Sequence, residues 1–391
     1  MSTEIKLSHT ADGTPCARLY LGRAPITGKQ IRPYREFPGM TDEEATRAAE
    51  DWQRSIADTY EKDAQKTGAL LARYVDDLET RKSPYNTIKT YRLYNRRYAA
   101  PLAKVPVQKV TAANLDDLFT VLLTKGPHGG RPLANVTVKK FREYLRGAFN
   151  SFVRLGILNT NPVGDTMQIP ASRAEAHALD ESDVMILKAE LDRILAESPD
   201  TNIGVMRRNA AFGMLLALNT GARVGEVCAI RRRDVRLTGR IESINGTVIE
   251  REGTAERQDH TKGKKPRNVA IDEATAEAIR GHISWQRGYL GTTDRNTPIC
   301  TVDGRYMSPS TLSWQYSRLR IALSLDPLTT FHSLRHTHAT MLLTAGVDIR
   351  TVSERLGHAQ VSTTLETYAH VMAGRDQRAA DMFGELLEFS T

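Results

Sequence analysis

Residues 332–346 read His-Ser-Leu-Arg-His-Thr-His-Ala-Thr-Met-Leu-Leu-Thr-Ala-Gly, a pattern that predicts a buried helix with a glycine C-cap. His332 and Arg335 are three residues apart and therefore share one face of this helix. His338 falls on the opposite, core-facing side, where we expect a packed or hydrogen-bonded histidine. The other members of that side are predicted to be Leu334, Met341, Leu342 and Ala345.

Zinc binding is one explanation for three closely spaced histidines. His332, His336 and His338 do not converge on one helical face, however, and the sequence contains no HExxH arrangement. We therefore predict no metal ligands in this stretch.

The chain downstream of this helix predicts two further short helices. Asp348 is a good cap for the first, which ends at Leu356-Gly357-His358. The second starts near Ser362 and carries Tyr368. Taken singly, His358 is explained as a loop residue and Tyr368 as a half-buried aromatic residue with a satisfied hydroxyl.

Upstream, an apolar helix over residues 210–218 leads to a sharp corner, and Arg223 follows that corner. By itself, Arg223 is explained as a surface residue paired with Glu226. Asn245-Gly246 lies between two alternating runs and predicts a two-residue β-hairpin. Lys262 lies in the basic turn that follows, where a lysine is ordinarily only solubilising.

Together these motifs are harder to explain one by one, because they resemble the tyrosine recombinase (phage integrase) family in the family's own order. The resemblance covers residues 178–391. In chain order, the motifs are Thr220-Gly221-Ala222-Arg223-Val224-Gly225-Glu226, Thr261-Lys262-Gly263 before Arg267 and Val269, His332-Ser333-Leu334-Arg335-His336-Thr337, Leu356-Gly357-His358, and Thr367-Tyr368-Ala369-His370. One departure is Arg232, where many relatives carry a tryptophan that packs the fold.

The resemblance implies a catalytic role for six residues. Tyr368 would be the nucleophile, and Lys262 the general acid. Arg223 and Arg335 would bind the scissile phosphate, with His332 and His358 assisting. No metal or nucleotide cofactor is implied.

Elementary chemistry agrees with these roles. Planar guanidinium groups stay protonated and match the oxygens of a phosphate, so two arginines can replace the metal ions of other phosphoryl-transfer enzymes. A lysine crowded by cations can have a pKa low enough to protonate a leaving oxygen. A tyrosine hydroxyl, with a reference pKa of about 10, needs a nearby base or strong positive charge to attack at neutral pH, and we expect His332 and the two arginines to supply it.

The expected fold is a multidomain α+β protein. Residues 1–62 are predicted to form a small three-stranded sheet plus a helix, similar to an arm-type DNA-binding domain. Residues 66–165 are predicted to form a helical core-binding domain. Residues 175–391 would form the catalytic tyrosine recombinase domain, mainly helical with a small antiparallel sheet.

Candidate DNA contacts lie in the two N-terminal parts. A strand laid into a DNA groove and a merely solvated basic face both explain the basic residues near the start of the chain. Two predicted helices further on begin with polar, basic first turns, which attract phosphate or are ordinary surface caps. The candidates are Arg18, Lys29, Arg32, Thr87, Lys89, Arg92, Lys139 and Arg142.

Composition points the same way. The net charge of +8 suits a polyanionic partner, although a merely basic enzyme explains it equally well. Three scattered cysteines form no disulfide framework and suit a reducing compartment. The polar N-terminus resembles no signal peptide, and no run approaches membrane-spanning length, so we expect a soluble, cytoplasmic protein without membrane contact.

The resemblance implies double-stranded DNA as the partner, with core and arm-type attachment sites, and a homotetramer on that DNA. An excisionase or a DNA-bending host protein would be a further partner. The apolar tail would dock on a neighbouring protomer or back on its own domain. Its anchors would be Met382, Phe383, Leu386 and Leu387.

Two rival functions remain open at this point. A type IB topoisomerase uses the same residue types but acts without a specific site. A DNA-binding architectural protein or repressor would have lost the chemistry, although all six expected catalytic positions are present. The favoured function is a site-specific recombinase that integrates or excises a mobile element, such as a viral genome, through a 3′-phosphotyrosine intermediate.

Overall fold

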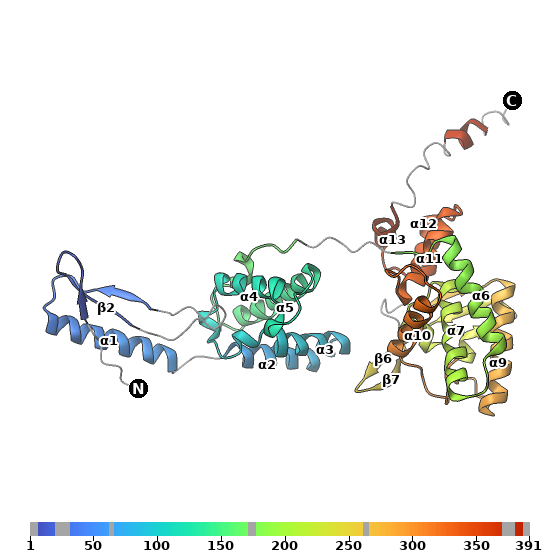
Figure 1. The fold of residues 1–391 in the computed structure, drawn as a ribbon, viewed down its shortest axis with the longest axis horizontal. Helices are drawn as coiled ribbons and strands as arrows, with labels where there is room; N and C mark the ends of the chain where they lie inside the picture. The colour runs from blue at the N-terminus through green and yellow to red at the C-terminus, as the bar shows by residue number, and fades with distance from the viewer. Residues whose placement is uncertain are drawn as a thin grey trace. The chain divides into compact units, whose positions relative to one another are not determined.

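The computed structural model describes residues 7–19, 32–61, 66–170, 177–260, 266–369 and 380–385, with the backbone alone over 54–61. The chain divides into two compact units, residues 1–174 and 175–391 (Figure 1). Each unit has its own hydrophobic cores. No helix in the described part of the chain is long and apolar enough to cross a membrane.

The first unit begins with a three-stranded antiparallel sheet of β1 (Leu7–His9), β2 (Pro15–Arg18) and β3 (Tyr34–Glu36), with β2 in the centre. Helix α1 (Asp42–Glu61) packs on it. The helix begins with the expected capping box, because the backbone N–H of Thr41 donates to Glu44 at 2.9 Å. The core between sheet and helix consists of Ala17, Phe37, Ala45 and Ala49.

The rest of the first unit is a helical bundle. Its long helix α5 (Asn135–Arg154) buries one face at three- and four-residue spacing, including Val138, Phe141 and Leu145. Gly68 allows α2 to approach Ala103, because a Cβ atom there would lie 2.9 Å from the Ala103 backbone. The other elements are α2 (Thr67–Thr80), α3 (Tyr85–Leu93), the π-helix η1 (Tyr94–Tyr98), η2 (Ala100–Leu102), η3 (Val107–Lys109), α4 (Ala112–Thr124), η4 (Pro127–Gly129) and η5 (Pro162–Asp165).

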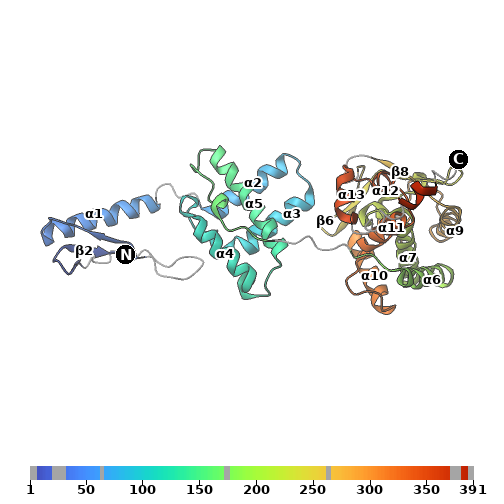
Figure 2. The same cartoon turned by 90° about the horizontal axis from the view of Figure 1, so that it is seen from above.

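The second unit is built around helix α7 (Asn202–Thr220), which is buried along most of its length. Helices α6 (Glu181–Glu197) and α9 (Glu273–Leu290) lie beside it (Figure 2). Further helices are α8 (Val224–Ala229), η6 (Arg232–Asp234), α10 (Pro309–Ala322), α11 (Phe331–Thr344), α12 (Ile349–Leu356) and α13 (Val361–Tyr368), and residues 380–385 are also helical. Together the two units confirm the expected α+β fold class.

Two small antiparallel sheets complete the second unit. One has the order β4-β5-β8, formed by β4 (Val235–Arg236), β5 (Ile241–Ile244) and β8 (Arg267–Ala270). The other pairs β6 (Thr247–Arg251) with β7 (Thr254–Gln258).

The hairpin predicted at Asn245-Gly246 is therefore wrong, because β5 and β6 pair with different partners. Asn245 instead donates to Asp234 at 2.9 Å and accepts from Arg257 at 2.5 Å. Gly246 lies against the Arg257 guanidinium, where a Cβ atom would come within 2.4 Å. Asn245-Gly246 therefore links two different sheets and makes partly buried polar contacts. Local sequence alone does not distinguish such a link from a tight turn.

Arg232 packs the fold, as expected of the position where relatives carry tryptophan. Its side chain is buried, with Nε donating to Gln286 at 2.8 Å and Nη1 donating to the carbonyl of Thr292 at 2.7 Å.

Glu242, in the central strand β5, is a buried acid for which the described part of the structure offers neither carboxyl oxygen a hydrogen-bond partner. Burial raises the pKa of Glu242 to about 8, against the opposing charges of Arg267 and Arg355. The carboxyl group is therefore protonated in the folded protein at neutral pH.

We expect Glu242→Gln to flatten the pH dependence of stability. A folded-state pKa above the unfolded value favours the fold at low pH, and that advantage is lost as the pH rises towards 8. The stability advantage of the variant over the parent should therefore be about 4 kcal/mol larger near pH 8.5 than near pH 5. Thermal melting at both pH values measures this, with the exposed Glu256→Gln as the control. A constant difference at both pH values would contradict the expectation.

Candidate active site

Arg335 projects from α11 and is 2% exposed. Its Nη1 donates to the carbonyl of Gly221 at 2.7 Å, whereas its buried Nη2 has no acceptor among the described residues. A buried N–H group without an acceptor is costly, so this one is available for a ligand. Burial, and then the charges of Arg223 and Arg267, lower the pKa of Arg335 to about 9.

Gly221 forms the corner that positions both arginines. Its φ of +68° is left-handed, and a Cβ atom there would lie 2.7 Å from Leu356 and 2.9 Å from His338. Glycine is therefore required at this point on two grounds, conformation and space. The corner offers its carbonyl to Arg335 and starts the short segment that leads to Arg223.

Arg223 and Arg267 are held by the same buried carboxylate, Glu226. Glu226 accepts from Arg223 Nη1 at 3.0 Å and from the Arg223 backbone N–H at 2.9 Å. Arg267 donates to it from Nη1 at 3.2 Å and from Nη2 at 2.8 Å. Burial alone would raise the pKa of Glu226, but the hydrogen bond and charge of Arg267, with Arg223, hold it at about 2. The pairing of Arg223 with Glu226 was expected; the fork from Arg267 was not.

Tyr368 lies at the end of α13 and is 1% exposed. Its ring packs among Ala339, Leu343, Val352 and Leu356, and its hydroxyl lies 2.7 Å from Nδ1 of His336. Burial raises the pKa of Tyr368 to about 12, although Arg335 acts in the opposite direction. The hydroxyl is therefore protonated in the free protein.

The two predicted assisting histidines flank this pair. The His332 ring meets the His336 ring edge to face at 4.7 Å. His358 Nδ1 lies 2.7 Å from the Thr364 hydroxyl, which places it between α12 and α13. Desolvation, followed by the charges of Arg335, Arg223 and Arg267, lowers the pKa of His358 to about 4. The pKa of His332 is lowered by desolvation and then by His336, Arg335 and Arg223.

Five of the six residues predicted to act in catalysis therefore influence one another electrostatically. We call this group, with Arg267 and His336 added, the cationic cluster. Its members are Arg223, Arg267, His332, Arg335, His336, His358 and Tyr368. The sixth, Lys262, lies outside the described residues.

Neighbouring contacts brace the cluster. His338 lies 2.8 Å from the carbonyl of Leu218 and accepts at Nε2 from Arg355, as a packed and hydrogen-bonded histidine should.

The prediction of which residues of α11 face the core is only partly right. Met341 is 43% exposed, and Ala339 and Leu343 are buried in its place. The buried face of α11 is thus rotated, because it packs against both α7 and α12.

Two of the three candidate DNA contacts near the N-terminal sheet are exposed, and the third lies outside the described residues. Arg18 is exposed on β2 and lies over the Tyr34 ring at 5.4 Å. Arg32 is exposed beside β3. Lys29 lies outside the described residues.

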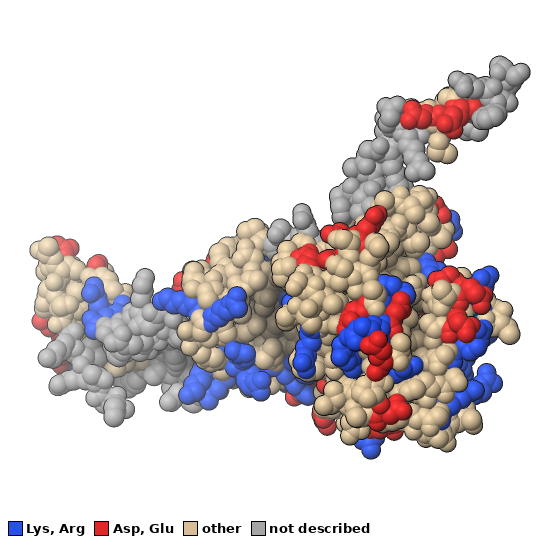
Figure 3. Space-filling model, turned by 45° about the vertical axis from the view of Figure 1, so that its right-hand side comes forward, with Lys and Arg blue, Asp and Glu red and all other residues tan. Residues whose placement is uncertain are grey.

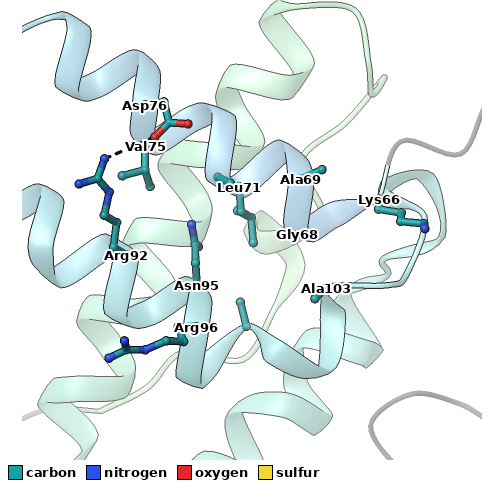
Figure 4. Close-up of a pocket in the computed structure, with 12 residues that line it drawn as sticks. Lys66, Gly68, Ala69, Leu71, Val75, Asp76, Arg92, Asn95, Arg96 and Ala103 are labelled. Carbon is teal, nitrogen blue, oxygen red and sulfur yellow. Dashed lines mark ion pairs between the residues drawn. The ribbon is translucent and has the colours of Figure 1, made fainter.

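In the helical bundle, Lys89 and Lys139 are exposed in the early turns of α3 and α5, and Thr87 is half-buried. The visible face of this region carries many Lys and Arg atoms and few Asp or Glu (Figure 3). Arg92 is not free, because its guanidinium lies 2.5 Å from Glu79 and 3.6 Å from Asp76. It lies on the rim of a cavity of about 520 Å³ between α2 and the segment that follows α3 (Figure 4).

The expectation that Arg142 faces DNA needs correction. Arg142 is 3% exposed, and its Nε donates to the Thr166 hydroxyl at 2.8 Å while Nη2 donates to the carbonyl of Val163 at 3.1 Å. The side chain therefore fastens η5 to α5. Its position in the sequence, one turn after two lysines, did not reveal that it lies on the buried face of the helix.

The C-terminal segment exposes apolar side chains, as expected. Met382 is 56% and Phe383 is 64% exposed. Leu386 and Leu387, the other predicted anchors, lie outside the described residues.

Two residues of the site, His336 and Arg267, lie within or beside the sequence motifs, but the sequence did not predict a role for either. His336 follows Arg335 directly and falls between the two faces assigned to its helix, so its side chain could not be placed. Arg267 was only a motif neighbour of Lys262, and its fork to Glu226 joins residues 41 positions apart. Long-range contacts of this kind do not follow from periodicity.

Comparisons with known proteins agree with this geometry. Residues 185–375 match the family model described as "Phage integrase family". The tyrosine recombinase XerA of Thermococcus kodakarensis is 30% identical over 293 residues, which is 74% of this chain and 85% of that protein.

Two solved structures share the fold at 19% identity. The integrase of transposon Tn1549, in complex with a circular intermediate DNA, aligns over 80% of this chain and 98% of its own with a TM-score of 0.63. A lambda integrase dimer bound to a core site aligns over 94% of this chain and 96% of its own with a TM-score of 0.57. With the family model and the relative of 30% identity, these findings show that the chain belongs to the phage integrase family and is a tyrosine-type site-specific DNA recombinase.

Proposed function

We propose that this recombinase cleaves and rejoins DNA through a 3′-phosphotyrosine bond to Tyr368, and that it integrates or excises a mobile element such as a viral genome. The observation that carries the proposal is the buried Nη2 of Arg335, which has no acceptor among the described residues. The same guanidinium is close enough to Arg223 to be affected by its charge, and close enough to Tyr368 to act on the pKa of the hydroxyl. A non-bridging oxygen of a phosphodiester is the kind of acceptor that this group lacks.

In the proposed reaction, Arg223 and Arg335 bind the non-bridging oxygens and stabilise the charge that develops on them. The Tyr368 oxygen attacks phosphorus and gives up its proton to a neighbouring imidazole, and the bond from phosphorus to the 5′ oxygen breaks. Lys262 protonates that leaving oxygen, while His332 and His358 assist at the phosphate. Attack by the 5′ hydroxyl of another strand reverses these steps without ATP, because the phosphotyrosine bond keeps the energy of the diester.

Tyr368 has to become accessible before it can react. The residue is 1% exposed in the free protein, and α13 packs against α12 through Thr364 and the residues around it. We infer that DNA binding shifts α13 enough to bring the hydroxyl to a phosphate held by the two arginines. The free protein would then be protected from reaction with unsuitable DNA.

The N-terminal parts would recognise the DNA sequence of the recombination sites. We assign arm-type sites to residues 1–62, core sites to residues 66–165, and the chemistry to residues 175–391. Exposed Arg18, Lys89 and Lys139 support contact with phosphates. The Tn1549 and lambda integrases are bound to DNA in their solved structures, which supports DNA as the partner of this chain.

We further propose a homotetramer on paired sites, with Met382 and Phe383 docked on a neighbouring protomer. The exposed apolar surface of these residues supports this assembly, as does the lambda integrase tetramer on a Holliday junction. An excisionase or a DNA-bending host protein would set the direction of the reaction, which would take place in the cytoplasm.

The proposal is tested by trapping the adduct. Nicked duplexes tiled over the DNA that flanks the gene for this chain lose a short fragment after cleavage, so the covalent complex accumulates. Mass spectrometry of the trapped peptide should place the DNA on Tyr368, and sequencing of the product should define one recombination site. An adduct on another residue, or none on any duplex, would refute the proposal.

The rival functions give other results in the same assay. A type IB topoisomerase would relax supercoiled plasmids that lack the site. An architectural protein would bind the duplexes tightly without forming an adduct.

A further inference from the structure

His336 lies within hydrogen-bond distance of the reacting oxygen, the Tyr368 hydroxyl, in this structure. Its Nδ1 lies 2.7 Å from the Tyr368 hydroxyl, and their rings are tilted by 55° with centroids 5.8 Å apart. His336 is not one of the six residues of the proposed mechanism, so that mechanism gives it no role. A group within hydrogen-bond distance of a nucleophile is the first candidate for its base.

The direction of this hydrogen bond follows from proton affinities. Burial and then Arg335 lower the pKa of His336 to about 4, and burial raises the pKa of Tyr368 to about 12. At neutral pH the imidazole is therefore neutral and the phenol keeps its proton. The hydroxyl donates to Nδ1, so the imidazole carries its own proton on Nε2.

His332 is in a different position. It lies on the first turn of α11 and meets His336 ring to ring, and no hydrogen bond from it to Tyr368 is present in the described structure. The charged and titratable groups around His336 are therefore Tyr368 from α13, Arg335 and His332 from α11, and His358 after α12.

We propose that the hydrogen bond between Tyr368 and His336 is kept when α13 shifts on DNA binding, and that His336 accepts the proton of the Tyr368 hydroxyl as the oxygen attacks phosphorus and returns it when the strand is rejoined. The proposal rests on the proposed function, in which Tyr368 is the nucleophile. As the bond from oxygen to phosphorus forms, the O–H bond breaks and Nδ1 takes the proton. The leaving 5′ oxygen takes a different proton, from the general acid.

DNA binding and the attack itself change the two proton affinities in the required direction, the first at His336 and the second at Tyr368. The negative phosphate favours the imidazolium form of His336 and so raises its pKa. Charge passes from the phenol oxygen to the phosphoryl oxygens as the new bond forms, so the hydroxyl becomes more acidic during attack. The free protein, with a neutral imidazole, is ready to accept a proton.

The test compares two substitutions at His336 with the same substitution at His332. In His336→Asn, the amide oxygen takes the place of Nδ1 and accepts the hydrogen bond, but it cannot take the proton. Single-turnover cleavage of the nicked duplex by the full chain should fall by about 10²- to 10⁴-fold at neutral pH, with DNA binding unchanged. His336→Gln, a second variant, guards against misfolding of the first, and melting temperatures identify a folded protein.

The pH profile separates a base from a packing residue. Without its base, the reaction depends on the phenolate form of Tyr368, so the rate of His336→Asn should rise about tenfold per pH unit above neutrality. The parent and His332→Asn should rise much less over the same range. A profile of the His336 variants parallel to the parent, or the steep profile in His332→Asn instead, would overturn the proposal.

A sulfur-substituted substrate separates the base from the acid. A duplex with sulfur at the 5′ bridging position releases a thiolate that needs no proton. It should restore the rate of Lys262→Ala but leave the defect of His336→Asn in place, and restoration of His336→Asn would assign that residue to the acid step. Failure of the proposed function is distinguishable, because the parent would then form no adduct on Tyr368.

Discussion

Tyr368→Phe is expected to form no covalent adduct with the nicked duplex, while it binds the same duplex with the affinity of the parent. Phenylalanine keeps the ring that packs among Leu343, Val352 and Leu356 and removes only the attacking oxygen. Phosphoryl transfer to the protein has no other acceptor in the proposed mechanism. Denaturing gels measure the adduct, and mobility shifts measure binding.

Loss of the hydroxyl should affect stability only slightly. It leaves Nδ1 of His336 without its donor, which costs about 1 kcal/mol of unfolding free energy. Tyr316→Phe is a matched control, because its buried hydroxyl also makes one hydrogen bond, to Thr329 at 3.0 Å. Adduct formation by Tyr368→Phe would show that another residue is the nucleophile.

Arg335→Ala is expected to lower the single-turnover cleavage rate by about 10³-fold without destabilising the protein. The guanidinium donates to the Gly221 carbonyl and leaves Nη2 for the phosphate, so its removal withdraws charge where the transition state is most negative. Its lowered pKa shows that burial and the neighbouring Arg223 and Arg267 disfavour its charged form in the free protein. A residue held against such a cost serves function rather than stability.

Arg335→Lys tests the geometry of the group. A lysine keeps the positive charge but cannot bridge a carbonyl and a phosphate with one planar fork, so we expect most of the defect to remain. Arg350→Ala, which removes an exposed arginine paired with Glu354, is the control for charge alone. A melting temperature well below that of the parent, or full activity of the lysine variant, would contradict these expectations.

Much of this architecture could be predicted from local sequence. Caps and breakers mark real helix ends, as at Thr41 and Asp348. The motif order also led to five residues whose side chains affect one another in the second unit.

The errors have a common physical cause. The near sequence neighbours of Arg142, Met341 and Asn245 do not indicate where these side chains lie, because each position depends on a partner that is distant along the chain or on a whole packed face. The hydrogen bond to Thr166 fixes the side chain of Arg142, and the hydrogen bond from Arg257 fixes that of Asn245. The role suggested for His336 could not be predicted for the same reason, since Tyr368 lies 32 residues away.

The left-handed corner at Gly221 has a consequence for protein engineering. Because one end of Arg335 is fastened to a main-chain carbonyl at this corner, and Arg223 leaves from the same corner, the separation of the two guanidinium groups is set by main-chain geometry. Directed evolution towards new target sequences can therefore vary the N-terminal unit widely, whereas libraries that randomise this corner should be dominated by inactive clones. A designer who wants a retargeted enzyme would leave the corner untouched.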